Sequence, residues 1–363
     1  MESPVLTPRQ GMLLRLIIQE NVRDATPVAS RMLVDRYNLD ISTATVRNEM
    51  AYLEELGYLM QPHTSAGRVP TEKGFRYFVE RLLEEQALPP VEQRMIAHQF
   101  HQARDRIGQW IPLAASVLAR TTRGAAVVTA PRAVHAVYKH LELIVTHGRA
   151  VLMILVLQGG TIKQRMLALS TPLNQGELSE IADRLNQLCS GLTAGEVMAH
   201  LATLPPLESD IAQLVVTLMG QTAEQPADEL YHRGLPELLQ EPEFAESEDS
   251  SADLVRVLEE QSLLQTVIAD VLSPTVGIGG VRVLIGGEGR WEELRACSMI
   301  LTRYGVANYA TGTLGVLGPI RMPYGRAIAV IRFVANVLNE MVYEMYEPFS
   351  QELLEDQNDQ EAI

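Results

Sequence analysis

The chain is poor in several kinds of residue, and each shortage excludes a class of protein. Its 363 residues include only 2 cysteines, too few for a disulfide framework or a cysteine metal site. Aromatic residues make up 5%, so any core must be mainly aliphatic. The longest apolar run, 150–157, is far shorter than a membrane span, and the first residues lack the pattern of a signal peptide. A cytoplasmic protein is therefore expected.

Basic residues are also in the minority. The chain has 30 Lys and Arg against 45 Asp and Glu, a net charge of −15, which excludes a protein that coats nucleic acid through its overall charge. The excess of acids is uneven, because residues 1–81 hold 10 bases and 10 acids. This neutral segment is compatible with a local DNA-binding module. A hydrophobic content of 47% and the chain length predict two or three globular domains.

The first eighty residues contain clear signals for the starts of helices. Capping residues and prolines predict four helices, which begin after Thr7, Thr26, Ser42 and Thr71. A strand, a turn-rich loop and a returning strand are expected over 58–70, between the third and fourth helices. Three helices, a hairpin and a further helix are the order of a winged helix-turn-helix, in which one helix enters the major groove of DNA.

The third predicted helix has one apolar face. Val46, Met50 and Leu53 recur at helical spacing and should be buried. The opposite side suits DNA, because arginine pairs with guanine, asparagine pairs with adenine, and hydroxyls or helix N-terminal amides bind phosphate. We therefore predict DNA contacts from the start of this helix, at Ser42, Thr43, Thr45, Arg47 and Asn48.

The hairpin and the helix after it supply a second predicted set of DNA contacts. Small, turn-forming and basic groups there suit close approach to the DNA backbone or the minor groove. The residues are His63, Thr64, Ser65 and Arg68, with Lys73 and Arg76 just behind them. The alternative is an ordinary solvated hairpin in a module used for protein contacts.

The rest of the chain predicts an α+β arrangement interrupted by helices. Strands are expected at 137–145, 151–157, 161–169, 281–285 and 314–317. Helices are expected at 91–123, 174–222, 252–272, 291–304 and 328–346, with an acidic loop at 241–251. Because two β-rich parts flank a helical stretch, we expect one α+β domain with a helical insertion. Apolar stripes in that insertion, over 174–272, are the predicted dimer contact.

Several stretches of the chain resemble the heat-inducible transcription repressor family HrcA. The longest are Pro62–Thr71 in the hairpin and Gly315–Tyr324 near the C-terminus. The others are 6–10, 27–30, 42–50, 53–59, 234–239, 242–244 and 285–288. Two departures from the family pattern are Pro323, where the family usually has an acid, and Gly286-Gly287-Glu288, which is one glycine longer than the common form.

The resemblance implies a multidomain α+β fold with four parts. These are a winged helix-turn-helix at 1–86, a GAF-like domain at 91–173 and 273–346, an inserted helical dimerisation domain at 174–272, and an acidic tail at 347–363. It also implies a homodimer that represses heat-shock chaperone operons, binds an inverted-repeat operator in double-stranded DNA and is released on heat stress. The GroE chaperonin is the implied folding partner. No enzyme activity, cofactor, metal or membrane association is expected.

A second class of function stays open from the residues alone. A ligand-sensing GAF-type regulator would carry the same DNA-binding module and bind a small molecule in its α+β domain. The glycines at 277–280 and 286–289 either cradle a phosphate or form tight turns, although neither stretch has a Walker A pattern. Arg321 and Tyr324 either line a site or close a loop.

Overall fold

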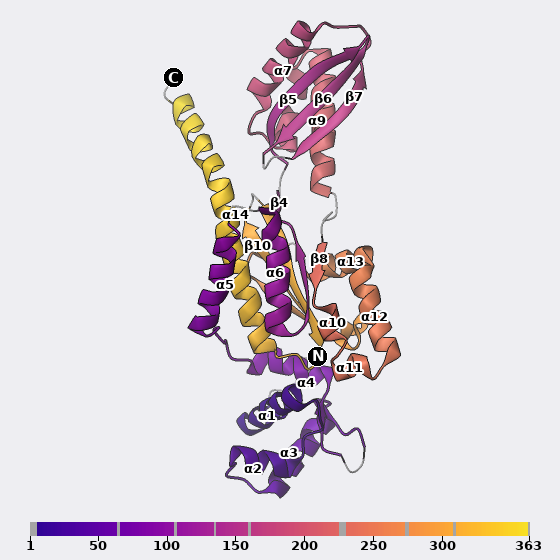
Figure 1. Cartoon of the computed structure of the whole chain (residues 1–363), viewed down its shortest axis with the longest axis vertical. Coiled ribbons are helices and arrows are strands. Elements are labelled where there is room, and N and C mark those ends of the chain that lie inside the picture. Colours follow the sequence, from indigo (N-terminus) through magenta and orange to yellow (C-terminus); the bar gives the residue numbers. More distant parts are fainter. Residues whose placement is uncertain are drawn as a thin grey trace. The chain divides into compact units, whose positions relative to one another are not determined.

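The computed structural model describes residues 6–63, 66–104, 107–133, 136–158, 161–224, 230–272, 276–307 and 310–361. It combines helices and strands, as an α+β protein should, and divides into two compact units (Figure 1). The first unit comprises residues 1–129, 229–304 and 313–338. The second comprises residues 130–228, 305–312 and 339–363. Within the described residues, no helix is both long and apolar enough to cross a membrane.

The first unit begins with the predicted order of three helices, a hairpin and a helix, which we call the N-terminal part (residues 6–82). The helices are α1 (Pro8–Asp24), α2 (Ser30–Tyr37), α3 (Thr43–Glu55) and α4 (Glu72–Tyr77), which continues as the π-helical turn η1 (Phe78–Leu82). Strand β1 (Leu59–Met60) pairs antiparallel with β2 (Val69–Pro70). Thr7, Ser42 and Thr71 each accept a backbone N–H at a helix start, as predicted.

The start of the second helix differs from the prediction. The helix begins at Ser30 instead of directly after Thr26. Val28 forms an isolated antiparallel bridge to Arg68, with N–H to O distances of 2.8 and 2.9 Å between the two backbones. This bridge holds the chain extended in front of α2, because a residue cannot be helical and strand-paired at once.

Among the described residues, six strands form the main sheet, most of which lies in the first unit. Their order is β8 (Leu230–Arg233), β3 (Ala125–Thr129), β11 (Ala310–Pro319), β10 (Cys297–Val306) and β9 (Val281–Ile285), and β4 (Arg132–Ala133) also pairs with β11. Strands β3 and β8 are antiparallel neighbours, and Thr129 lies opposite Leu230. Helices α5 (Pro90–Gln102), α6 (Ile107–Thr122) and α14 (Tyr324–Glu361) accompany this sheet (Figure 1).

Two predictions around this sheet are wrong. Residues 297–304, expected as part of a helix, form most of β10, because a strand buried on both faces lacks the alternation that marks a strand in sequence. The expected acidic loop at 241–251 contains α11 (Pro242–Ala245) and the start of α12 (Glu248–Glu259), with Phe244 buried. Together with α10 (Leu235–Leu238) and α13 (Gln261–Val271), these helices share a hydrophobic core with β3 and β10.

The second unit contains a separate three-stranded antiparallel sheet. Its strands are β5 (Tyr138–His147), β6 (Ala150–Leu157) and β7 (Ile162–Ala168), close to the predicted positions. One face packs on α7 (Gln175–Cys189), α8 (Ala194–His200) and α9 (Pro206–Glu224) in a single hydrophobic cluster; the short η2 (Leu201–Thr203) lies between the last two. The strands therefore group with the helices that follow them, whereas the sequence division assigned them to the GAF-like domain. Residues 230–272, assigned to the insertion, pack in the first unit.

The other face of this three-stranded sheet is open. Successive side chains of a strand point to opposite faces of the sheet, so every second side chain of β5–β7 points away from α7–α9. The strand pairing sets them in three rows across the sheet. Six of the nine are apolar, and none is fully buried: Ile144, Leu152, Ile154, Val156, Ile162 and Met166. We call these six residues the open face.

Candidate nucleic-acid interface

Helix α3 presents a solvent-exposed stripe because its opposite side is fully buried. Val46 and Leu53 are 0% exposed and Met50 is 1% exposed, so they fix the rotation of the helix about its axis. Arg47 and Asn48, which follow Val46 in sequence, lie off this buried face and are exposed. Within the described part of the chain, neither side chain has a hydrogen bond or an ion pair to the protein. Both are therefore available to an external partner.

The start of α3 is ordered by its cap. The Ser42 hydroxyl accepts the Thr45 N–H at 3.1 Å and lies 2.9 Å from the Thr45 hydroxyl. Ser42 is exposed and Thr43 is half-buried. An exposed helix N-terminus with unpaired amides and nearby hydroxyls provides the chemistry that binds a phosphate oxygen.

The predicted residues of the hairpin divide into two groups. His63 is exposed, whereas Thr64 and Ser65 lie outside the described residues. Arg68 points inward: its side chain is 15% exposed, and its Nε–H donates to the Glu54 carboxylate at 2.8 Å. Arg68 thereby joins the hairpin to α3, and its guanidinium is already occupied by a protein partner.

Lys73 and Arg76 also have partners inside the molecule. The Lys73 ammonium donates to the Leu56 carbonyl at 2.7 Å, which satisfies an unpaired acceptor at the end of α3. It also lies 4.8 Å from the centre of the Tyr58 ring. The Arg76 guanidinium donates to the Glu288 carboxylate at 2.8 Å. Of the four cations predicted to contact DNA, Arg47 alone lacks a partner among the described residues.

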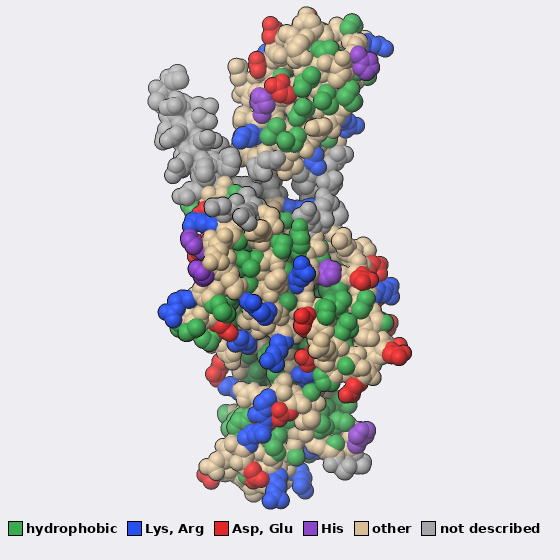
Figure 2. Space-filling view, viewed as in Figure 1, with side chains coloured by type: hydrophobic (Ala, Val, Ile, Leu, Met, Phe, Trp, Pro, Cys, Tyr) green, Lys and Arg blue, Asp and Glu red, His purple; other side chains and the backbone are tan. Residues whose placement is uncertain are grey.

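Sequence reasoning missed two exposed residues, one on α3 and one on α2. Tyr52 is 46% exposed and lies four residues after Asn48, on the same side of α3. Arg31 on α2 has a side chain 85% exposed, with only Asp35 at 3.5 Å as a partner. Helical spacing from Asn48 would have identified Tyr52. Figure 2 shows basic side chains at several separate places over the N-terminal helices, and no continuous basic patch.

A buried carboxylate holds α1 and α2 together under this surface. Glu20 is 1% exposed and accepts hydrogen bonds from Arg23, Arg36 and the Tyr37 hydroxyl, the last at 2.6 Å. Burial, followed by the bond to Glu20, raises the pKa of Tyr37 to about 12. The network fixes the helix pair on which α3 packs.

The residues that suggested a ligand site have structural partners. Arg321, 13% exposed, is bound by the Glu241 and Glu243 carboxylates and donates to the Val22 carbonyl at 3.3 Å. The glycines at 286–289 form a tight turn. Among the described residues, no group of three or more His, Cys, Asp or Glu side chains is arranged to hold a metal ion.

The chain is similar to a well-defined group of proteins. The family model described as HrcA protein C-terminal domain matches residues 108–328. The heat-inducible transcription repressor HrcA of Roseiflexus castenholzii is 45% identical over 349 residues, which cover 94% of this chain and 96% of that protein. The repressor of the same name from Chloroflexus aurantiacus is 41% identical over 356 residues, 95% of this chain and 96% of the relative.

One solved structure is similar in fold. It is described as a hypothetical protein and superposes with a TM-score of 0.58 at 24% identity, covering 94% of this chain and 99% of the other.

Proposed function

The chain belongs to the HrcA family of heat-inducible transcription repressors, and from this premise we propose that it is a sequence-specific DNA-binding repressor of heat-shock chaperone operons. The observation that carries the proposal is the exposed stripe of α3. Arg47 and Asn48 there have no hydrogen-bond or ion-pair partner in the described part of the chain, and the opposite side of the helix is buried. In a winged helix this helix enters the major groove, where both side chains can read base edges.

The other predicted contacts take different parts in this proposal. Ser42, Thr43 and Thr45 bind phosphate at the helix start together with its amides. His63, Thr64 and Ser65 at the hairpin tip approach the DNA backbone or minor groove. Arg68 and Lys73 act indirectly, because they hold the hairpin and α4 against the end of α3.

We propose a homodimer that binds an inverted repeat, with the second unit as the inserted dimerisation domain and the main sheet as the core of the GAF-like domain. The helical stripes first suggested for the dimer contact are not free, because Ile181, Leu185, Ile211 and Leu258 are buried within one chain. The open face of β5–β7 is a better candidate. A two-fold axis would set it against the same face of a second copy and bury the six apolar residues.

The test is binding to duplexes that cover the regions upstream of the organism's chaperone operons, measured by fluorescence anisotropy over a range of salt concentrations. Arg47→Ala should cost about 1–3 kcal/mol on the operator and little on random DNA, because a base contact is lost. Arg94→Ala on α5 removes the same charge from an exposed site elsewhere and is the matched control.

The outcomes separate the possible kinds of contact. Equal losses on operator and random DNA would make Arg47 a phosphate contact, with a salt slope reduced by about one unit. No preference of the unaltered protein for any chaperone upstream region would refute the proposed function.

The family resemblance also carries two proposals about regulation. Repression ends on heat stress, and the GroE chaperonin assists folding into the DNA-binding form. Refolding the denatured chain with and without GroE and ATP, then titrating operator, tests the second. An equal yield of operator-binding protein in both cases would contradict it.

A further inference from the structure

Stretches outside the N-terminal part that resemble the HrcA family lie against its helices. Glu288, in the turn after β9, binds Arg76 of α4. Arg321, in the loop after β11, reaches the Val22 carbonyl of α1 and is held by Glu241 and Glu243. Both loops therefore make contacts within the first unit.

The turn that carries Glu288 has an unusual backbone. Residues Gly286, Gly287, Glu288 and Gly289 all have positive φ, at 61°, 67°, 52° and 71°. Glycine adopts this left-handed conformation without cost, but a residue with a Cβ does not. Glutamate at the third position therefore carries a local backbone cost, and such costs cluster at functional positions.

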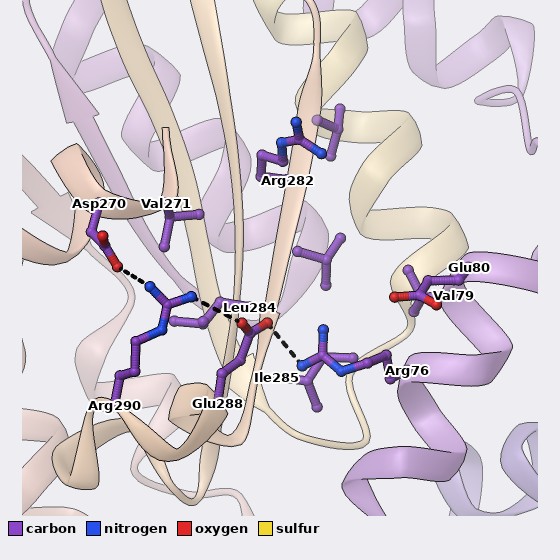
Figure 3. A pocket seen from close by; sticks show the side chains of 12 residues that line it. Arg76, Val79, Glu80, Asp270, Val271, Arg282, Leu284, Ile285, Glu288 and Arg290 are labelled. Carbon is purple, nitrogen blue, oxygen red and sulfur yellow. Dashed lines mark hydrogen bonds and ion pairs between the residues drawn. The ribbon is translucent and has the colours of Figure 1, made fainter. Parts of the chain in front are cut away.

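The side chain of Glu288 explains why this position holds a carboxylate. It bridges two arginines, with Arg76 at 2.8 Å and Arg290 at 3.6 Å, and Arg290 is anchored in turn by Asp270 at 2.7 Å (Figure 3). These groups line a cavity of about 410 Å³ between α4–η1 and β9. In Figure 3, Glu288 lies between the two guanidinium groups, whereas Arg282 stands apart from them.

Two further contacts hold α4 at the same place. The Glu72 carboxyl lies where a Cβ on residue 286 would stand, and the positive φ of residue 286 also favours glycine. On the inner side of α4, the Phe75 ring lies 6.1 Å from the Tyr324 ring, and the Tyr324 hydroxyl donates to the Ile320 carbonyl at 2.7 Å. An aromatic contact and an ion pair thus fix α4 from two directions.

We propose that Arg76 and Glu288 form a latch that orients the N-terminal part, so that the two α3 helices of a dimer reach their half-sites at one set spacing. The proposal rests on the proposed function and deepens it. Arg76 is then a positioning residue and does not bind DNA. When the latch is broken, each α3 still reads its half-site, but the spacing between half-sites is less strictly enforced because α4 loses its ion pair to the turn after β9.

The experiment is a double-mutant cycle on the full-length protein with Arg76→Gln, Glu288→Gln and the double variant. Hydrogen exchange of α4 amides, measured without DNA, reports the contact itself. Affinity for operators with half-site spacing changed by a few base pairs reports the function. Each single variant should raise the exchange rate of the α4 amides about threefold or more and reduce the dependence of affinity on half-site spacing. The double variant should change both quantities no more than either single variant does.

Two control variants separate the latch from other effects. Glu288→Gly removes the carboxylate while relieving the left-handed strain, so it should release α4 without lowering the melting temperature of the protein. Arg290→Gln removes the other partner of Glu288 and should leave α4 exchange unchanged. A Glu288→Gly variant with normal α4 exchange and normal spacing preference overturns the proposal.

Two outcomes keep this proposal distinct from the proposed function. If Arg76→Gln weakens all DNA binding and lowers the salt slope while Glu288→Gln does neither, Arg76 is a phosphate contact and the latch is wrong. The unaltered protein could instead bind no operator while both substitutions still speed α4 exchange non-additively. The Arg76–Glu288 contact would then hold α4 as proposed, and the proposed function would fail.

Discussion

The guanidinium of Arg68 is bound to the carboxylate of Glu54, with Nε to Oε2 at 2.8 Å, so the base of the hairpin is fixed to the last turn of α3. The Arg68 backbone is paired at the same time with Val28 in front of α2. One residue thus joins the hairpin to both helices. Its influence on DNA binding passes through the position of the hairpin.

Arg68→Ala and Glu54→Ala should have the same effect, because each removes one side of a single ion pair. We expect a destabilisation of about 1 kcal/mol in urea unfolding, since the pair is partly buried. The salt slope of DNA binding should stay constant. A slope reduced by about one unit for Arg68→Ala alone would place its guanidinium on a phosphate.

Glu20→Ala should destabilise the protein by about 1–3 kcal/mol, because a buried acceptor of three hydrogen bonds is lost. The cost stays below that of a fully buried pair, since the side chains of Arg23 and Arg36 are 49% and 44% exposed and can hydrate. Urea unfolding measures it. Asp35→Ala, which removes only an exposed ion pair on α2, is the control and should change the free energy of unfolding by less than about 0.5 kcal/mol.

Glu72→Gln should stabilise the protein at neutral pH. Burial raises the pKa of Glu72 above its usual 4.5, and this outweighs the opposite effect of Arg76 and Arg295. The folded state therefore binds a proton more tightly than the unfolded state, and the contribution of Glu72 to stability falls as pH rises through the interval between the two pKa values. Melting temperatures of the variant and the unaltered protein should differ at pH 7 and converge below about pH 4. A gap of the same size at both pH values would contradict this.

Met166→Lys on the open face of β5–β7 should convert the proposed dimer to a monomer. A charge placed in an apolar contact must be desolvated without a partner. Light scattering at several protein concentrations measures the mass. Met198→Lys on α8 is the matched control, because the two methionines are 54% and 52% exposed. A dimer that survives Met166→Lys, or that is lost with Met198→Lys instead, places the contact elsewhere.

Local signals predicted most of the N-terminal part. The caps at Thr7, Ser42 and Thr71 depend on neighbours three residues away, so the sequence is sufficient to locate them. The buried face of α3 follows from helical spacing. The partners of Arg68, Lys73 and Arg76 were not predictable, because they lie 14 to 212 residues away along the chain. The sequence around an arginine does not show whether its side chain will bind a DNA phosphate or a carboxylate far away in the same chain.

The division of the second half of the chain failed for a related reason. Strands β5–β7 were located correctly, and their turns predict an antiparallel meander. Distant segments decide whether such a meander joins another sheet, so sequence order did not show that these strands stay apart from the main sheet. The helices over 235–271 have the same amphipathic pattern as α7–α9 yet pack on the main sheet. Periodicity reports which face is buried, not what covers it.

Because Thr129 pairs with Leu230, one connection between two neighbouring strands of the main sheet, residues 130–228, supplies most of the second unit. While residues 130–228 are folded, they form a compact segment between β3 and β8. Once they unfold, the same residues become a long flexible loop, and closing it costs entropy that grows by about 0.6 kcal/mol with each doubling of loop length. Unfolding of residues 130–228 therefore weakens the pairing of β3 with β8 at the edge of the main sheet. The two units lose stability together.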